Sequence, residues 1–335
     1  MQLSGEAVRV ALVYNEPVPD RYHELGEAKA ELGVMDEVQA VSEALVELRY
    51  AAVLVPLRPP LNQIRGQMEA LNVDVVFNLF EGFDGSPETE SKFAAILSEL
   101  KLPFTGCPAA ALEMALDKVK TKRLLERAGI RIPRYQILTP ETLSTFSLGY
   151  PSIIKPMAEH ASHGMSEDSV VRDFAALEKQ VIKICTFYGG KALVEEFVDG
   201  REFNTTVMGN DRLRVPAISE IVFTLPPDKP RVLTFAAKWE ENSLYFDHTR
   251  AVCPAAISAR EQAEIGRIAR AAFRLVGCRG YARVDFRQDA AGRFKVLEVN
   301  PNPDITPGSG AALQTATAGM TYSQFVKKLI RLALK

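Results

Sequence analysis

Residues 280–304 read GYARVDFRQDAAGRFKVLEVNPNPD, and this stretch decides how the rest of the chain is interpreted. Two apolar segments flank the turn sequence QDAAG, which predicts a β-hairpin. Because side chains alternate between the two faces of a strand, Arg283 and Asp285 share one face of the first strand. Glu298 and Asn300 share one face of the second strand. A buried polar group without a partner costs about 1–3 kcal/mol, so these side chains need something to bind.

The hairpin therefore offers two carboxylates and an amide oxygen beside an arginine. Such an oxygen-only set is typical of Mg²⁺, which keeps few protein ligands and takes phosphate oxygens for the rest. The competing interpretation is a set of ordinary ion pairs with Arg283 and Lys295. That interpretation leaves the loop of asparagines and prolines at residues 300–304 unexplained. A cation site for a phosphorylated ligand is the favoured interpretation.

The composition predicts a globular protein without a nucleic-acid or membrane partner. The chain has 335 residues, of which 47% are hydrophobic and 24% charged, and its formal net charge is −2. This length predicts two or three domains, and the small net charge gives no basic footprint for nucleic acid. No apolar run reaches the ~18 residues of a membrane span, and the N-terminus lacks a signal-peptide layout. Four scattered cysteines predict reduced thiols, so we expect a cytoplasmic location.

Strands and helices alternate in the first third of the chain. Residues 8–14, 50–56 and 73–80 are continuous apolar runs, the pattern of strands covered on both faces. Segments between and after them carry apolar side chains at helical spacing, which predicts an α/β unit with a mostly parallel sheet. Further strands and helices follow, and we place three units at residues 1–111, 112–199 and 200–335.

Three isolated lysines point to phosphate. Lys118 lies in the first turn of a predicted helix, where free N–H groups also favour anions. Lys155 interrupts an apolar strand, and Lys238 follows another apolar stretch. Each alone is as simply explained as a solvated surface side chain, but together with the cation site they favour nucleotide binding. The segment 192–203, ALVEEFVDGREF, offers backbone and carboxylates to an adenine edge and a ribose.

These pieces, in this order, resemble the ATP-grasp superfamily and, within it, the D-alanine–D-alanine ligase group. The resemblance covers nearly the whole chain and is clearest from Val73 onward. It implies an N-terminal parallel-sheet (pre-ATP-grasp) domain, a central ATP-grasp subdomain and a C-terminal subdomain with the Mg-binding hairpin, an α/β fold with α+β domains. It also implies an ATP-dependent ligase that joins a small carboxylate to an amine, both amino acids, through an acylphosphate. ATP and two Mg²⁺ ions are the implied cofactors, with Mn²⁺ as a substitute, and a homodimer is the implied assembly.

The resemblance also implies a role for each site residue. The implied phosphate, base and ribose contacts are Lys118, Lys155, Glu195, Glu196, Val198, Glu202, Lys238 and Leu297. The implied metal ligands are Asp285, Glu298 and Asn300, and the implied catalytic residues are Arg283, at the tetrahedral intermediate, and Ser309, at the carboxylate of the second substrate.

The chain departs from the family where the amino acids bind. The glycine-rich segment with its glutamate for the first amine is replaced by residues 14–29, and Glu37 nearby matches it poorly. Glu81-Gly82 replaces a histidine–glycine pair, Ala161 and Trp239 replace a serine and a tyrosine that close a lid, and Asp304 replaces a glycine. We therefore expect poor D-Ala-D-Ala synthesis and a different amino acid or amine-bearing substrate, with Asp304 as a contact for a cationic amine.

Some alternatives stay open at this point. His160 and His163 form an HxxH in the predicted phosphate loop, and they are candidates for a metal site, a substrate contact or a solvated loop. The alternative functions are a small-molecule kinase that stops at phosphoryl transfer and a nucleotide-binding regulator without turnover.

Overall fold

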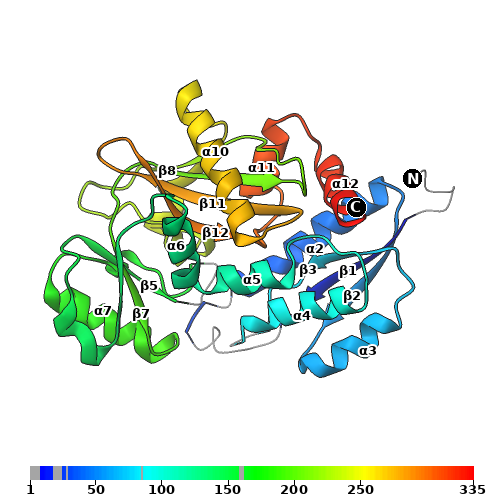
Figure 1. Ribbon diagram of the computed structural model, residues 1–335, viewed down its shortest axis with the longest axis horizontal. Coiled ribbons are helices and arrows are strands. Elements are labelled where there is room, and N and C mark those ends of the chain that lie inside the picture. Colours follow the sequence, from blue (N-terminus) through cyan, green and yellow to red (C-terminus); the bar gives the residue numbers. More distant parts are fainter. Residues whose placement is uncertain (1–7, 18–24, 28, 84–85, 158–161) are drawn as a thin grey trace.

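The computed structural model describes residues 8–17, 25–27, 29–83, 86–157 and 162–335. Their strands form three sheets, which Figure 1 shows in blue to cyan, in green, and in yellow-green to orange. The strands of each sheet lie within one of the three predicted units, while the boundaries themselves stay a prediction. In the described part of the chain, no helix is long and apolar enough to cross a membrane.

The N-terminal sheet has three strands in the order β2-β1-β3, and they are parallel, as predicted. They are β1 (Arg9–Asn15), β2 (Ala51–Leu57) and β3 (Val75–Leu79), and the helices around them are α2 (Lys29–Glu47), α3 (Ile64–Glu69), α4 (Glu88–Glu99) and α5 (Ala109–Leu116). Strand β3 is buried throughout, but four of the seven residues of β2 are exposed at its start. The expectation that all three strands are covered on both faces is wrong for β2, an edge strand with exposed residues, whereas the other edge strand, β3, is bridged along its edge by Phe104.

The central sheet is antiparallel, with the strand order β4-β7-β5-β6. Its strands are β4 (Tyr135–Leu138), β5 (Ser152–Pro156), β6 (Val170–Val171) and β7 (Ala192–Glu196). Helix α6 (Lys118–Arg127) leads into this unit, and helix α7 (Phe174–Phe187) packs on the sheet. Leu177, Val181 and Ile184 on one stripe of α7 form a separate apolar cluster with the strands.

The C-terminal sheet has the strand order β10-β9-β8-β11-β12. Its strands are β8 (Glu202–Met208), β9 (Ser219–Phe223), β10 (Thr249–Val252), β11 (Tyr281–Gln288) and β12 (Phe294–Asn300), with the helices α8 (Phe235–Trp239), α9 (Leu244–Asp247), α10 (Ala259–Val276), α11 (Gly310–Thr317) and α12 (Tyr322–Ala333). Strands β11 and β12 form the predicted hairpin. Helix α10 begins after a capping box of Ser258 and Glu261, and its C-cap is Gly277, which has φ +82°.

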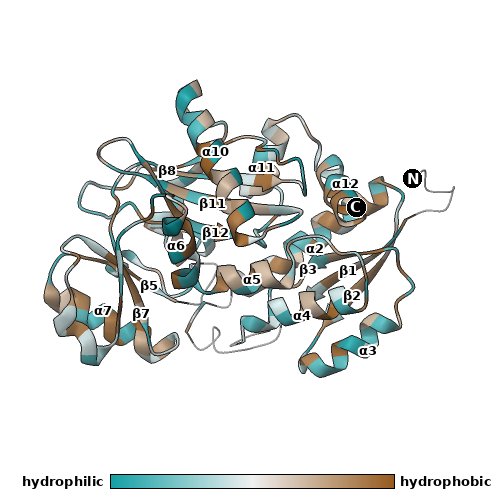
Figure 2. Cartoon of the chain, viewed as in Figure 1, coloured by the Kyte–Doolittle hydropathy of each residue, from teal (hydrophilic) through white to brown (hydrophobic). Residues whose placement is uncertain are grey.

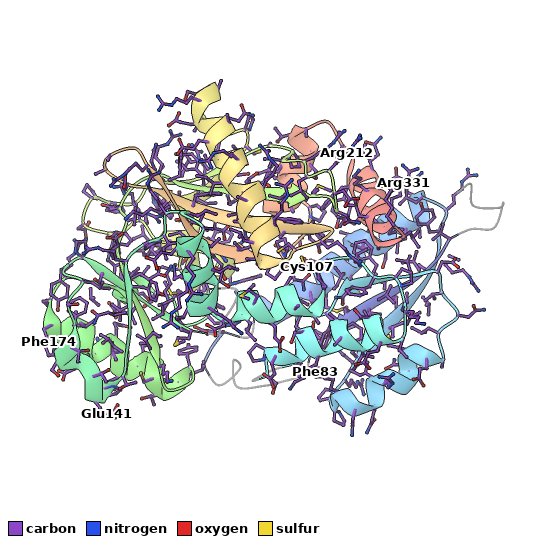
Figure 3. The ribbon with its side chains drawn as sticks, viewed as in Figure 1. Phe83, Cys107, Glu141, Phe174, Arg212 and Arg331 are labelled. Atoms are coloured by element: carbon purple, nitrogen blue, oxygen red, sulfur yellow. The ribbon has the colours of Figure 1, made fainter. Side chains whose placement is uncertain are left out.

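The first and last units share one core. Phe93 on α4 and Phe273 on α10 belong to the same apolar cluster as Phe286 of the hairpin, and α12 packs on α2 at the other side of the N-terminal sheet. Figure 2 shows the brown, apolar strands of the N-terminal sheet between helices of mixed colour. Cys107 is buried in this shared core near α5 (Figure 3), and all four cysteines are free thiols. The central unit, with its own cluster, is therefore the more independent of the three.

Candidate functional site

A cavity of about 640 Å³ is lined by residues from all three units. This size is within the range of small-molecule sites. Every site residue predicted from the sequence lines it, namely Lys118, Lys155, Glu195, Glu196, Val198, Glu202, Lys238, Arg283, Asp285, Leu297, Glu298, Asn300 and Ser309. The structure thus brings together side chains that are up to about two hundred positions apart in the sequence; their individual roles stay predictions.

The hairpin places its polar side chains as the alternation predicts. Asp285 is directly opposite Glu298, and Arg283 is directly opposite Asn300. Arg283 Nε donates to Asp285 Oδ1 at 2.7 Å and Nη2 donates to Oδ2 at 2.9 Å. Burial alone would lower the pKa of Arg283, but the Asp285 carboxylate raises it overall. The arginine is therefore held charged at the open face of the hairpin.

The same hairpin fits a hard cation only if a ligand completes the coordination. In the described part of the chain, no group of three or more His, Cys, Asp or Glu side chains is arranged to hold a metal. Two carboxylates and the Asn300 amide are an oxygen set, and phosphate oxygens are what Mg²⁺ takes for the remainder. Both oxygens of Asp285 accept from Arg283, but a carboxylate has about four acceptor positions and can do both. The residues present are thus suitable for Mg²⁺ bound together with a nucleotide.

The loop after the hairpin is fixed by its own polar groups. Asn300 Oδ1 accepts from the Asn302 N–H at 2.9 Å, and the Asn302 side chain donates to the Phe80 carbonyl at 3.3 Å. These bonds tie the end of β12 to the end of the N-terminal sheet. The ion-pair interpretation did not explain these asparagines. Their hydrogen bonds hold the loop at the rim of the cavity.

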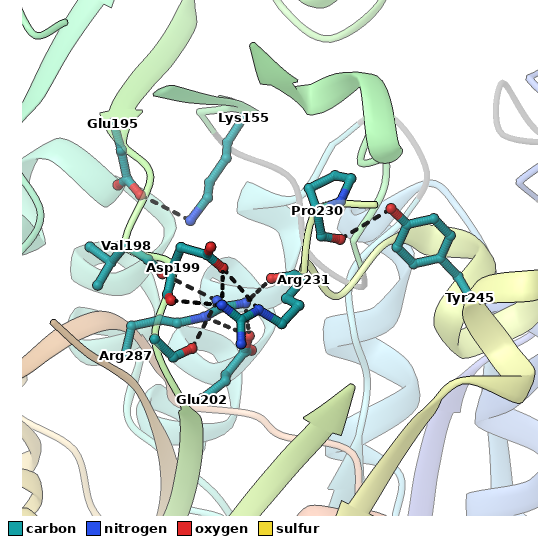
Figure 4. A network of polar contacts seen from close by, with 10 residues as sticks. Lys155, Glu195, Val198, Asp199, Glu202, Pro230, Arg231, Tyr245 and Arg287 are labelled. Carbon is teal, nitrogen blue, oxygen red and sulfur yellow. Dashed lines mark hydrogen bonds and ion pairs between the residues drawn. The ribbon is translucent and has the colours of Figure 1, made fainter. Parts of the chain in front are cut away.

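A buried glutamate joins two lysines on the central side of the cavity. Glu195 is 1% exposed, with Oε1 2.5 Å from Lys122 Nζ and Oε2 2.9 Å from Lys155 Nζ. Burial alone would raise the pKa of Glu195, but the two lysines lower it to about 2. Glu195 in turn raises the pKa of Lys155, against the effect of burial. We call Lys118, Lys122, Lys155 and Glu195 the lysine end of the cavity; Figure 4 shows the contact between Lys155 and Glu195.

Sequence reasoning missed Lys122. Its side chain is 3% exposed, and burial lowers its pKa despite the attraction of Glu195. Its Nζ is also 3.5 Å from the Leu297 carbonyl, so it connects α6 to β12. A signal was present, because Lys122 follows Lys118 by four positions and therefore lies on the same helix face. Lys118 itself donates to the Pro156 carbonyl at 3.3 Å, from the first turn of a helix capped by Asp117.

Arg287 was also missed, and it organises the segment between β7 and β8 (Figure 4). Its Nε donates to Glu202 Oε2 at 2.9 Å, and its Nη1 donates to the carbonyls of Val198 and Gly200 at 3.2 Å. The signal was its position two residues after Asp285, on the same face of β11. Val198 and Glu202, two of the residues predicted to contact the nucleotide, are thus held by a single arginine.

Ion pairs also account for Glu196 and Lys295. Glu196 pairs with Lys295, and its Oε2 accepts from Arg134 Nε at 2.9 Å. Burial alone would raise the pKa of Glu196, but these two cations lower it overall. The simple ion-pair interpretation of the hairpin is therefore right for Arg283, which pairs with Asp285. It is wrong for Lys295, which pairs outside the hairpin.

Carboxyl groups gather on the opposite side of the cavity, and we call Glu37, Glu81, Glu90 and Asp304 its acidic end. Glu37 is 5% exposed and accepts from the Ile305 N–H at 2.7 Å. Burial and then Asp304 raise the pKa of Glu37 well above its ordinary value. The same two causes raise the pKa of Glu81, which opens on the cavity, to about 7. Burial raises the pKa of Glu90 to about 8, with a smaller contribution from Glu81.

Two further predicted residues lie near this end. Ser309 Oγ donates to the Asp304 carbonyl at 2.9 Å, just before α11. Lys238 lies in the last turn of α8, where burial and then Arg283 lower its pKa. Asp285, Glu298 and Asp304 act on Lys238 in the opposite direction, so this lysine lies near the hairpin carboxylates and the acidic end.

The two histidines of the HxxH differ. His160 and Ala161 lie outside the described residues. His163 is 6% exposed, and its Nδ1 is 2.9 Å from Glu27 Oε2. The interpretation of His163 as part of a solvated loop is therefore wrong, because the N-terminal unit covers it. Trp239 lies against Gly33 of α2.

Comparison with known proteins shows which family and which solved structures the chain is similar to. Residues 124–331 match the family model described as the D-ala D-ala ligase C-terminus. A protein from Sinorhizobium fredii named as uncharacterized protein y4sG is 34% identical over 77% of this chain and 74% of its own. A D-alanine–D-alanine ligase from Saccharophagus degradans is 33% identical over 79% of each chain. The crystal structure of the D-alanine–D-alanine ligase from Bacillus anthracis complexed with ATP covers 98% of both chains, with a TM-score of 0.74 and 18% identity.

Proposed function

The chain belongs to the D-alanine–D-alanine ligase family of ATP-grasp enzymes, and from that premise we propose that it joins a carboxylate to an amine through an acylphosphate. One observation supports the proposal: the hairpin carboxylates line the same cavity as Lys118, Lys155 and Glu195. A nucleoside triphosphate needs positive charge and a divalent cation along its phosphates. The lysines that supply positive charge and the oxygen groups suited to a cation both line the cavity.

The reaction has two balanced steps. An oxygen of the substrate carboxylate attacks the γ-phosphorus of ATP, the bond to the β-phosphate oxygen breaks, and ADP leaves. The amine then attacks the acyl carbon, the bond to the phosphate oxygen breaks, and the amine gives up a proton. Mg²⁺ bound by Asp285, Glu298 and Asn300 would neutralise phosphate charge. Lys118, Lys155 and Lys238 place fixed positive charge for the same purpose.

Two residues are suited to the acyl centre. Arg283 is held charged by Asp285 at the open face of the hairpin, so its guanidinium is available to a developing oxyanion. Ser309, at the start of α11, is suited to a carboxylate of the second substrate, because free N–H groups at a helix start favour anions.

The substrate amine is the finer part of the proposal. Carboxyl groups with raised pKa values dominate the acidic end, and a cationic group there would relieve the repulsion between Glu37, Glu81 and Asp304. D-alanine carries one ammonium, whereas a diamino acid or a diamine carries an additional one. We therefore propose that a substrate with an additional amino group, such as a diamino acid or a diamine, replaces at least one D-alanine.

The test is phosphate release from Mg·ATP with pairs of amino acids and amines. The proposal expects ADP and phosphate, released only when a carboxylate and an amine are both present. AMP and pyrophosphate would place the chemistry in an adenylating class. A stable phosphorylated product formed without an amine would indicate a kinase instead.

A further inference from the structure

We propose that a second cavity, outside the candidate site, binds a small free amino acid, and that this ligand acts on a wall of the candidate site. The second cavity has a volume of about 270 Å³. It is lined by the 3₁₀ turn Glu167–Ser169, by β6 and α7, and by the loop at residues 224–234, which joins β9 to α8. None of its lining residues lines the 640 Å³ cavity, which we call the large cavity.

The second cavity is lined by a buried amide whose oxygen lacks a partner. Gln180 of α7 is 2% exposed, and its Oε1 accepts no hydrogen bond within the described part of the chain. Buried amide oxygens are nearly always paired, because an unpaired one lowers the stability of the fold. The neighbouring apolar side chains of α7 are packed in the core of the central unit, so the helix holds Gln180 in place. A ligand N–H or ammonium in the cavity would supply the missing donor.

The charged side chains around the second cavity leave one cation and one carboxylate unpaired. The lining holds three acidic and three basic residues, so its formal charge is zero. Arg172 and Asp228 form no ion pair with any described residue. The paired residues are Glu167 with Lys229, at 2.8 Å, and Asp168 with Lys179, at 4.0 Å. A ligand that carries both charges therefore suits the cavity better than an anion or a cation alone.

A small amino acid offers the groups that these residues need. Its carboxylate suits Arg172, because a planar guanidinium binds a carboxylate through two parallel hydrogen bonds. Its ammonium suits Asp228 and the Gln180 oxygen, both of which are acceptors. Val170 and Ala176 also line the cavity, so the ligand side chain should be short and apolar. An inorganic anion or a metal ion would satisfy only one of the two unpaired charges.

The loop at residues 224–234 forms a wall of both cavities. Pro230 lines the second cavity, whereas Val232 and Leu233 line the large cavity. Between them, the Arg231 carbonyl accepts from Arg287, the arginine that organises the segment between β7 and β8 (Figure 4). A ligand that holds this loop from the second cavity would therefore also fix the wall beside the predicted nucleotide contacts. Binding of the amino acid is independent of the proposed function, but its effect on ATP rests on that function.

The first experiment measures binding of D-alanine, L-alanine, D-valine and L-valine to the full-length chain by isothermal titration calorimetry, without nucleotide. At least one of them should bind, and Arg172→Gln and Asp228→Asn should each weaken this binding about tenfold or more, because each removes a charged partner. Alaninamide, which lacks the carboxylate, and lactate, which lacks the ammonium, should bind the wild type at least about tenfold more weakly than alanine.

Two further variants serve as controls for this experiment. Arg260→Gln changes an exposed arginine of α10 that lines neither cavity, and it should bind as the wild type does. Arg283→Gln changes the large cavity and should keep the binding that Arg172→Gln removes. The second control separates the second cavity from substrate binding in the large one.

Gln180→Leu distinguishes a binding role from a structural one. Leucine keeps a similar volume and removes the unpaired oxygen, so the thermal midpoint without ligand should stay equal or rise. A saturating amino acid should raise the midpoint of the wild type by more than that of the variant. A lower midpoint without ligand would mean that this oxygen is already paired in the fold, and it would overturn the binding role of Gln180.

The effect on ATP is measured by equilibrium dialysis with excess Mg²⁺, with and without the saturating amino acid. We expect the amino acid to tighten ATP binding about fivefold or more in the wild type and in Arg260→Gln, but not in Arg172→Gln. Equal ATP affinity in the wild type overturns the effect on the large cavity.

The binding site itself is overturned if none of the four amino acids binds, or if Arg172→Gln and Asp228→Asn leave binding unchanged. The second cavity would then hold water only. A wild-type chain that binds the amino acid but no adenine nucleotide instead overturns the proposed function, and with it the effect on ATP, but not the binding site.

Discussion

Each end of the cavity buries a glutamate, but the pKa of that glutamate is lowered at one end and raised at the other. At the lysine end, Glu195 is almost fully buried, yet two ammonium groups lower its pKa to about 2. At the acidic end, Glu37 is buried nearly as deeply, but its neighbours are carboxyl groups and its pKa is raised. Burial penalises the charged form at both ends, so the charges of the neighbouring groups decide whether the pKa is raised or lowered. Glu195 is therefore kept charged by its two lysines before any ligand binds, whereas the carboxyl groups of the acidic end need protons or a cation.

The largest effect on stability should come from removing the negative charge of Glu195 at the lysine end. Glu195→Gln leaves Lys122 and Lys155 buried without their counter-charge, which should lower the free energy of unfolding by roughly 3–5 kcal/mol. Urea unfolding followed by circular dichroism measures this. Glu69→Gln, in an exposed pair with Arg65, is the control and should leave the midpoint unchanged. Equal midpoints for the two variants would mean that Glu195 does not stabilise the buried lysines.

The next effect separates catalysis from stability at the hairpin. Glu298→Gln removes one charge from the open face of the cavity without removing volume, so the fold should persist. Turnover of ATP should fall about 10²–10³-fold, because a cation site beside the phosphates loses a ligand. Phosphate release, with circular dichroism of the same sample, measures both. Normal turnover with a normal spectrum would exclude Glu298 as a cation ligand.

The acidic end predicts a pH dependence of opposite sign to that of the lysine end. The pKa of Glu90 is about 8 in the fold and near 4.5 in the unfolded chain, so the fold keeps a proton that the unfolded chain loses. Stability should therefore fall as the pH rises from about 4.5 to about 8. Glu90→Gln should remove part of this fall, with a gain of roughly 1–3 kcal/mol at the upper pH and almost none at the lower.

Thermal or urea unfolding across that pH range checks this prediction, and Glu88→Gln, in an exposed pair on the same helix, is its control. Identical pH profiles for the wild type and the Glu90→Gln variant would show that the carboxyl groups of the acidic end are not forced towards their neutral forms.

The same contrast explains what the sequence could predict. The hairpin, the common face of Glu298 and Asn300, and the parallel N-terminal sheet follow from local alternation and spacing, and the structure confirms them. The pairing register, which shifts between Asp285 and Phe286, does not follow from alternation. Lys122 and Arg287 had local signals that were not used. The pairing of Glu27 with His163 had none, because it joins residues 136 positions apart through the packing of two units. The exposure of β2 likewise depends on its place at a sheet edge, which its apolar sequence does not encode.

The most direct test of the account is the substrate preference of the acidic end. Phosphate release is measured with D-alanine alone and with a panel of L-amino acids, β-amino acids, diamino acids and diamines, for the wild type and for Asp304→Asn. The account predicts that a diamino acid or a diamine, with its additional amino group, exceeds D-alanine in kcat/KM by about tenfold or more. Asp304→Asn should remove most of this advantage. A kcat/KM of roughly 10⁴ M⁻¹s⁻¹ or above for D-alanine alone, with no panel member better, would contradict it.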